Sequence, residues 1–599
     1  MELTKRQDIP TKETWNLRDL FSSTEEWDEA RQEVEQAAAK LSLFTEKIGE
    51  RAENLLHALE AREAVLEKLV PVMTYASLSL SSDGTDAIAQ GNSSLAQGTQ
   101  AIVQAEVAKV DAEILTLPPA IMEQFQTEKE ELQSFRVYLD KLTDTRPYAL
   151  SSETEEVLAA LSPILTSPYS TYLTSKSADM AFPTFTGANG EEFPLSFARF
   201  EDQYELSPHT EERRNAFIAF DDTLKKYEHT YAKLYASEVT KQVTLARLRG
   251  YESAEQMLLH SQNVTQAMYH NQLDTIYQEL APHMQRYAKL KKDVLGLDTF
   301  GFSDLKAPLD PEFEPVTSYE EAYDTIIEAL EPFGEEYGKM LKRAKEERWV
   351  DRADNVGKAT GAFCASPYGS HPYILLTWKD TMRGAFILAH ELGHAGHFYH
   401  ANAAQPLHAT RPSTYCIEAP STMNELFLGN HLLTKTDDPR MKRWITLQFI
   451  GTYYHNFVTH LLEGEFQRRV YALAEKGIPL TAIKLRETKQ AVLTGFWGDS
   501  VEINERAGRT WMRQPHYYMG LYPYTYSAGL TAATKAYTLY QEQGQPVIDK
   551  WLDMLQAGGT LAPLDLFKQS GVDMESKKTI QDAVAYVGTL INDLVNSYK

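Results

Sequence analysis

Helical periodicity runs through almost the whole chain and leaves few folds open to it. After Trp378 apolar residues keep a helical spacing almost to the end of the chain. The pattern changes at 349–378, where GAFCASPY (361–368) and YILLTW (373–378) are short apolar runs that predict strands. The sequence therefore predicts a mainly α fold with one small β-sheet. The first predicted helix starts at a capping box, Ser23 to Glu26, and its apolar spacing continues to Leu41. The other helices predicted before that sheet are 51–80, 86–115, 121–143, 152–165, 209–247, 252–260, 265–296 and 318–348.

The length of the chain predicts more than one hydrophobic core. It has 599 residues, and single cores stop growing beyond about 250–300 residues. A less regular segment from Thr174 to Pro194 separates the helices before it from those after it. We therefore place a boundary near residue 200, between an N-terminal helical region (1–200) and the remainder (201–599).

The net charge and the number of cysteines indicate which partners the protein can bind and in which cellular compartment it works. The net charge is −25, which disfavours binding to nucleic acid or to anionic membranes. Only Cys364 and Cys416 are present, which favours a reducing compartment. The first residues, MELTKRQDIPTKETW, lack the apolar run of a signal peptide. We expect a soluble cytoplasmic protein with neither nucleic-acid nor membrane partners; the sequence does not predict its oligomeric state.

The most informative motif is His390-Glu391-Leu392-Gly393-His394, within a predicted helix over 381–400. Helical residues four apart lie on one face, so both imidazoles can bind one metal ion. Glu391 can reach a water on that ion and act as general base without being a ligand. Zinc fits this donor set, because catalytic zinc sites use imidazole and carboxylate ligands and keep one position open for water.

A third protein ligand is expected in CIEAPSTMNE (416–425). Pro420 and Ser421 suggest the start of a second helix, with Glu418 just before it and Glu425 in its second turn. Glu418 lies 24 residues after His394, which leaves enough chain to pack the second helix against the first. Glu418 is therefore the predicted third ligand, and Glu425 is predicted to orient a ligand imidazole.

HELGH followed by E-A-P-S-x-x-x-E resembles the M3 family of zinc metallopeptidases, and above all its bacterial oligoendopeptidase F branch. The resemblance covers about 205–585, and the N-terminal helical region also fits the branch. It implies two helical lobes enclosing a deep substrate channel, a small sheet beside the zinc-binding helix, and 201–599 as the catalytic region. It also implies one Zn²⁺ per chain, with the ligands His390, His394 and Glu418, the catalytic base Glu391 and the outer carboxylate Glu425.

A tyrosine-rich segment, PHYYMGLYPYTYSAG (515–529), follows later in the chain. One hydroxyl or imidazole donor aimed at the oxyanion of peptide hydrolysis can contribute about 3 kcal/mol, and the M3 family uses a His and tyrosines from this part. Pro523 suits the first position of a helix, which places Tyr522 and Tyr526 near one face. Aromatic packing is an equal alternative for each tyrosine. The candidates are His516, Tyr522 and Tyr526, with Tyr518 or Tyr524 as substitutes.

Two further features carry less specific predictions. Gly361, Ala362 and Phe363 are expected to form an edge strand that binds an extended peptide through main-chain hydrogen bonds, as the family does beside its zinc; alternatively the sheet only braces the metal helix. His397 and His400 follow on the predicted helix. We interpret them as packing or solvent-facing residues, because three ligands are already assigned.

The predicted activity is zinc-dependent hydrolysis of internal peptide bonds in short oligopeptides, a size limit that the resemblance alone implies. One alternative is a related HExxH exopeptidase, either a carboxypeptidase or a dipeptidase. Another is a non-catalytic peptide-binding protein, which would have no need of Glu391. The sequence predicts neither the preferred side chains around the cut bond nor the length limit of the substrate.

Overall fold

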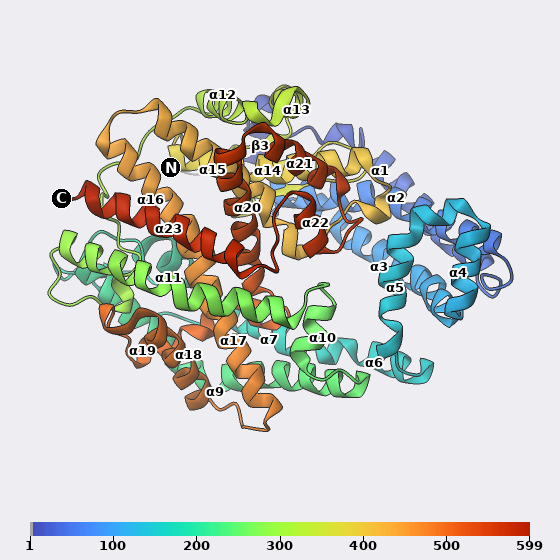
Figure 1. Cartoon of the computed structure of the whole chain (residues 1–599), viewed down its shortest axis with the longest axis horizontal. Coiled ribbons are helices and arrows are strands. Elements are labelled where there is room, and N and C mark those ends of the chain that lie inside the picture. Colours follow the sequence, from blue (N-terminus) through green and yellow to red (C-terminus); the bar gives the residue numbers. More distant parts are fainter. Residues whose placement is uncertain (1–3) are drawn as a thin grey trace.

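The computed structural model describes residues 4–599, and it is mainly helical with two small β-sheets (Figure 1). The first helices pack around a core of their own that runs from Trp27 to Leu139. Ser23 caps α1, and Trp27 donates its indole N–H to the backbone oxygen of Val72 at 2.9 Å. These helices are α1 (Thr24–Ala39), α2 (Ala52–Ser82), α3 (Ala87–Thr116), α4 (Pro119–Glu128) and α5 (Arg136–Asp144). They are followed along the chain by α6 (Ser152–Leu165).

The helix predicted over 121–143 is in fact two helices, α4 and α5, which lie at one end of the molecule in Figure 1. The segment predicted to be irregular holds a hairpin in which Phe185 pairs with Phe193. Its strands are β1 (Phe185–Thr186) and β2 (Glu192–Phe193). Before the hairpin comes α7 (Ser167–Thr174). After it come α8 (Phe197–Arg199), α9 (Thr210–Arg249), α10 (Ala254–His260) and α11 (Gln266–Val294).

The hydrophobic core changes earlier than residue 200. Leu142 still packs against the N-terminal core, whereas Tyr169 and Tyr172 already belong with the large core that extends to Leu594. The β1–β2 hairpin therefore packs with the C-terminal part of the chain. The same large core surrounds the helix of the HELGH motif.

The predicted helix over 318–348 is divided into α12 (Tyr319–Ala329) and α13 (Gly334–Glu346). Pro332 lies between them, and Gly334 has a φ of 86°, a conformation that glycine adopts without steric cost. A three-stranded sheet follows, in the order β3 (Val350–Asp351), β5 (Tyr373–Leu375), β4 (Phe363–Ala365). β3 is parallel to β5, β4 is antiparallel to it, and β4 forms an edge.

The C-terminal helices enclose α14, which carries the HELGH motif. α14 packs against α15, α15 against α20, and α11 against α23. None of the helices in residues 4–599 has the length and apolar character needed to span a membrane. The helices are α14 (Met382–Ala404), α15 (Glu418–Lys435), α16 (Pro439–Tyr453), α17 (His460–Glu475), α18 (Ala482–Trp497), α19 (Glu505–Gly508), α20 (Pro523–Gln543), α21 (Gln545–Ala557), α22 (Pro563–Gln569) and α23 (Lys577–Ser597).

Candidate metal centre and active site

His390 and His394 lie one turn apart on α14, as their spacing predicts. Thr381 caps this helix by accepting a hydrogen bond from the backbone N–H of Gly384 at 3.2 Å. The ring centroids of the two histidines are 4.9 Å apart, and the rings are nearly perpendicular. Both imidazoles therefore face the same side of the helix.

Glu418 is the first residue of α15, and its carboxylate faces both imidazoles. Its Oε2 lies 3.4 Å from Nε2 of His390 and 3.5 Å from Nε2 of His394. The sequence placed Glu418 just before the helix, so the helix begins earlier than predicted. Ser421 donates a hydrogen bond to the same carboxylate oxygen at 3.2 Å. Two imidazoles and one carboxylate thus converge on one point.

Two glycines, Gly393 and Gly529, allow neighbouring helices to pack closely against the start of α15, where Glu418 lies. A Cβ on Gly393 would lie 2.5 Å from Cα of Ser421, so α14 and α15 can approach this closely only with glycine there. A Cβ on Gly529 of α20 would lie 2.9 Å from Cβ of Glu418. The first turn of α15 is therefore held between the other two helices.

The three donor atoms fit a divalent metal ion. They lie within 4.8 Å of one another. Two ligands at tetrahedral angles on one zinc ion, each about 2.0–2.1 Å from it, lie about 3.4 Å apart. The separations of 3.4 and 3.5 Å from the Glu418 carboxylate match this value and exceed the usual length of an N–H···O hydrogen bond. Two nitrogens and one oxygen are also a donor set that zinc accepts.

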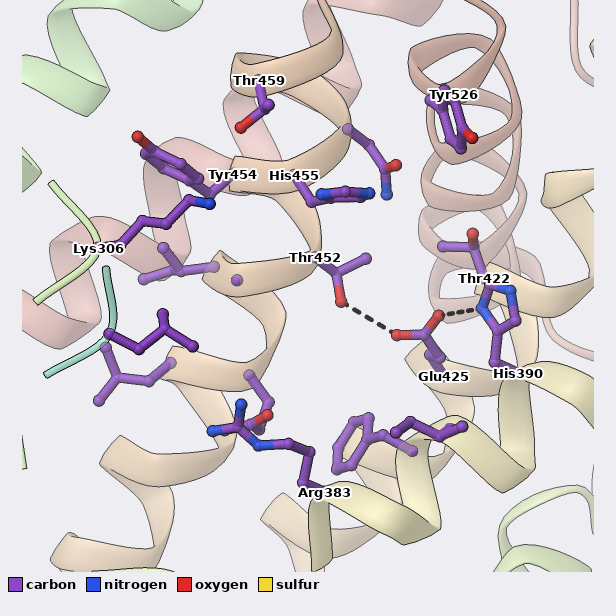
Figure 2. A pocket seen from close by; sticks show the side chains of 18 of the residues that line it. Lys306, Arg383, His390, Thr422, Glu425, Thr452, Tyr454, His455, Thr459 and Tyr526 are labelled. Carbon is purple, nitrogen blue, oxygen red and sulfur yellow. Dashed lines mark hydrogen bonds and ion pairs between the residues drawn. The ribbon is translucent and has the colours of Figure 1, made fainter. Parts of the chain in front are cut away.

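Glu425 sets the orientation of His390 (Figure 2). Nδ1 of His390 donates a hydrogen bond to Oε1 of Glu425 at 2.7 Å, and Oε2 of Glu425 accepts one from the Thr452 hydroxyl at 3.0 Å. Since the proton of His390 is on Nδ1, its Nε2 keeps a free lone pair for a metal. These are the contacts that the role predicted for Glu425 requires, and the role itself stays a prediction.

Glu391 is buried at the floor of this site, with 5% of its surface exposed. Burial raises the pKa of its carboxyl group, and the neighbouring His390 and His394 act in the opposite direction. A carboxyl group with a raised pKa is suited to accept and return a proton near neutral pH.

His397 and His400 lie outside the three-donor group. His397 is fully buried, no ring nitrogen of it has a hydrogen-bond partner, and burial lowers its pKa to about 3. His400 stacks on the ring of Tyr337 at 5.7 Å. His397 in turn stacks on the ring of Phe398 at 5.0 Å, so each of the two rings packs against an aromatic neighbour.

His516, Tyr522 and Tyr526 come together although they belong to different elements. Tyr526 lies on α20, Tyr522 directly precedes that helix, and His516 lies in a short 3-10 helix at Pro515–Tyr518. The ring of His516 is 5.5 Å from Tyr522 and 5.8 Å from Tyr526, and the two tyrosine rings are 5.3 Å apart.

The other tyrosines of this segment lie in the core. Tyr517 and Tyr518 pack against Tyr235, and neither hydroxyl has a hydrogen-bond partner. Tyr524 donates its hydroxyl to the side chain of Gln262 at 2.7 Å. Of the tyrosines considered from the sequence, Tyr522 and Tyr526 are therefore the pair grouped with His516.

A cavity of about 700 Å³ opens beside the candidate metal centre. His390, Glu391 and Glu418 line it on one side, together with Tyr526. The opposite wall comes from the end of α16 and the helix that follows it (Figure 2). Two of the three candidate metal ligands, His390 and Glu418, thus face a space large enough for several side chains.

The predicted edge strand is shorter than expected. β4 begins at Phe363, so Gly361 and Ala362 lie just before it, and Gly361 has a φ of 84°. α14 packs against both β4 and β5. The sheet therefore lies beside the helix of the HELGH motif, with β4 at one of its edges.

The sequence did not predict a role for His455, which lines the cavity, or for two buried residues close to it, His460 and Glu463. Nδ1 of His460 lies 2.8 Å from Oε2 of Glu463, and its Nε2 lies 3.1 Å from Nε2 of His455. The ring of His460 stacks on that of Tyr526 at 4.1 Å. The spacing His-x4-His-x2-Glu was present in the sequence, but a gap of five residues does not place side chains on one face of an α-helix.

Comparison with known proteins agrees with this arrangement. The family model described as "Peptidase family M3" matches residues 203–586, and the model described as "Oligopeptidase F" matches residues 113–182. Oligopeptidase PepF of Bacillus subtilis is 32% identical over 582 residues, covering 97% of this chain and 87% of the relative. An oligoendopeptidase F homolog of Borreliella burgdorferi is 28% identical and covers 97% of this chain and 98% of its own.

Solved structures show the same likeness. A crystal structure of a peptidase from Chlamydophila abortus superposes with a TM-score of 0.87 at 26% identity, covering 100% of both chains. Oligoendopeptidase-F from Enterococcus faecium superposes with a TM-score of 0.75 at 25% identity, covering 96% of this chain and 99% of its own. The chain therefore belongs to peptidase family M3, in its oligoendopeptidase F branch.

Proposed function

We propose that this protein is a zinc-dependent endopeptidase that hydrolyses internal peptide bonds of oligopeptides. The observation that carries the proposal is the convergence of His390, His394 and Glu418 next to the buried carboxyl group of Glu391. Membership of peptidase family M3 supports the reaction class, and the oligopeptidase names of the relatives support the substrate class.

The three converging residues would hold one zinc ion per chain. When bound, zinc supplies Lewis-acid polarisation of the scissile carbonyl and acidifies the attacking water. Glu425 keeps the Nδ1 proton on His390 and so leaves Nε2 free for coordination. Ser421 restrains the carboxylate of Glu418 through its hydroxyl.

The remaining chemistry belongs to the protein's own side chains. Glu391 takes the proton of the attacking water as general base and passes it to the amine nitrogen of the leaving peptide. His516, Tyr522 and Tyr526 stabilise the negative charge that develops on the carbonyl oxygen. Their grouping beside the cavity supports this role.

Substrate binding is proposed to use the β4 edge and the cavity. An extended peptide would pair with the main chain from Gly361 to Phe363, which adds a strand to an open edge. The cavity would be the deepest part of a channel between two helical lobes, and a narrow channel would admit oligopeptides and exclude folded proteins. We propose residues 201–599 as the catalytic region, supported by a family model that matches 203–586. The helical region before it has a core of its own from Trp27 to Leu139.

The decisive experiment uses an oligopeptide with an acetylated N-terminus and an amidated C-terminus. An endopeptidase cuts it internally, and mass spectrometry identifies the fragments. A carboxypeptidase or dipeptidase leaves it intact, which would contradict the proposal. Chelator should abolish cleavage, and zinc should restore it.

A variant of Glu391 distinguishes an enzyme from a protein that only binds peptide. Glu391→Gln keeps the size of the side chain but removes the base, so turnover should fall by several orders of magnitude while peptide binding survives. Equal turnover in the wild type and the variant would exclude this role for Glu391. An inactive wild type that binds peptide would instead point to a peptide-binding protein.

A further inference from the structure

His455, His460 and Glu463 form a chain of hydrogen-bonded side chains that leads to the cavity. Glu463 and His460 are both buried, with 3% of each exposed, whereas His455 is exposed and lines the cavity. Figure 2 shows the ring of His455 extending from its helix towards the side where Tyr526 and His390 lie. These hydrogen bonds thus connect the buried carboxylate of Glu463 to the space beside the candidate metal centre.

A π-helix brings the two histidines together. Residues Tyr454–Thr459 form this π-helix between α16 and α17, and the backbone N–H of His460 bonds to the carbonyl oxygen of His455, five residues earlier. In an α-helix residues five apart point about 140° away from each other. The wider turn of a π-helix places them one above the other, and such turns are frequent at functional sites.

The distances distinguish this cluster from the candidate zinc site. His460, Glu463 and His516 also have donor atoms within 4.8 Å of one another. However, the contacts of His460 are 2.8 Å to Glu463 and 3.1 Å to His455. These are hydrogen-bond lengths, whereas the ligand atoms of the candidate zinc site are 3.4–3.5 Å apart. The cluster is therefore arranged as a hydrogen-bonded chain.

The buried carboxylate fixes the direction of the hydrogen bonds. Burial alone would raise the pKa of Glu463, but His460 and Lys489 outweigh it and the pKa is lowered. An ionised carboxylate only accepts, so Nδ1 of His460 donates to it. In the neutral ring Nε2 of His460 then accepts from the N–H at Nε2 of His455. The remaining nitrogen of His455, Nδ1, is left as an acceptor.

We propose that His455 is a substrate-binding residue whose Nδ1 accepts a hydrogen bond from an N–H group of the bound peptide, with His460 and Glu463 as positioning residues. This inference rests on the proposed peptidase function. The N–H group can belong to a main-chain amide or to the terminal ammonium of the substrate. Both present a donor to the same ring nitrogen.

The test is a set of peptides that each carry one N-methyl group at a different backbone position, together with an N-acetylated version. For the wild type, one of these changes should lower kcat/KM roughly 3- to 10-fold more than in His455→Phe, because the variant has lost the acceptor. If the donor is a main-chain amide, methylation at one backbone position should lower kcat/KM. If the donor is the terminal ammonium, N-acetylation should lower kcat/KM instead.

Companion variants separate binding from a structural role. His455→Asn retains an acceptor near the position of Nδ1. It should therefore recover part of the wild type's sensitivity of kcat/KM to the critical methylation or acetylation. His460→Phe keeps the stacking on Tyr526 but removes both hydrogen bonds. It should therefore reduce the same sensitivity of kcat/KM to the modified peptide. His229→Phe, at an exposed position of α9, should behave as the wild type.

Three results would overturn the inference. One is a methylation profile in His455→Phe that equals that of the wild type. Another is an equal loss of kcat/KM for every peptide, which would show a structural role. The third is a second zinc equivalent per wild-type chain that His460→Phe lacks, which would show a metal site. If the wild type cleaves none of the peptides, the proposed peptidase function itself fails.

Discussion

Glu425 accepts a hydrogen bond from Nδ1 of His390 at 2.7 Å, across the contact between α15 and α14. Its other oxygen accepts from Thr452, so both carboxylate oxygens have a fixed partner. The carboxylate therefore holds both the orientation and the protonation of a candidate metal ligand. Residues that hold a ligand in this way typically contribute 10- to 100-fold in metal affinity.

Replacing Glu425 should weaken zinc binding without removing a ligand. We expect Glu425→Ala to raise the Kd for zinc about 10- to 100-fold, measured by competition with a chelator of known affinity. Thr452→Val should have a smaller effect in the same direction. Glu328→Gln, which changes an exposed carboxylate on α12, is the matched control. An unchanged Kd in Glu425→Ala would contradict the orienting role.

Gly393 should be intolerant of a side chain. A methyl group there would lie 2.5 Å from Cα of Ser421, and such overpacking typically costs about 1–3 kcal/mol. Gly393→Ala should therefore lower the Tm and also weaken zinc binding, because the start of α15 carries Glu418. Gly98→Ala on α3 has open space around it and should instead stabilise by about 0.5–1 kcal/mol. Equal Tm changes in both variants would contradict this prediction.

The local parts of the candidate site could be predicted from the sequence. His390 and His394 are grouped because i and i+4 always share a helix face. The sequence predicts Glu418 just before the next helix and Glu425 in its second turn. In the structure both lie on α15, where their seven-residue separation keeps them on one side. These inferences need only the geometry of single helices and one contact between them.

The parts that depend on irregular backbone could not be predicted. The pairing of His455 with His460 requires the π-helix at Tyr454–Thr459, whereas an α-helical reading separates the two residues. The break between α12 and α13 depends on the turn at Gly334, and the short hairpin near Phe185 lies in a segment that has no regular periodicity.

Stability should depend on pH through Glu205. Burial alone would raise its pKa, but Arg513 and Lys306, which donate hydrogen bonds to it at 2.8 and 2.6 Å, lower the pKa to about 2. Because the folded-state value is lowered, this stabilisation is complete above the ordinary value of 4.5 and is lost as the pH falls towards about 2.

The matching experiment compares the wild type with Glu205→Gln over a range of pH. The shift corresponds to about 3 kcal/mol at pH 7, so the variant should have a clearly lower Tm there. The gap should narrow below about pH 4.5, since the wild type loses the contribution that the variant already lacks. Glu346→Gln, at an exposed position of α13, serves as control. A gap that is constant down to pH 4 would contradict the assignment.

Removing the metal should lower stability as well as activity, because an ion that binds only the folded chain stabilises it. Zinc at 1,000 times its Kd contributes about 4 kcal/mol, so chelation should lower the Tm of the wild type. In His394→Ala one of the three donors is missing, so its Tm should respond far less to chelator or added zinc. Glu391→Gln keeps all three donors and should respond as the wild type does, although it is inactive. If chelator lowers the Tm of His394→Ala as much as that of the wild type, the ion is bound elsewhere, and the site formed by His390, His394 and Glu418 is not the zinc site.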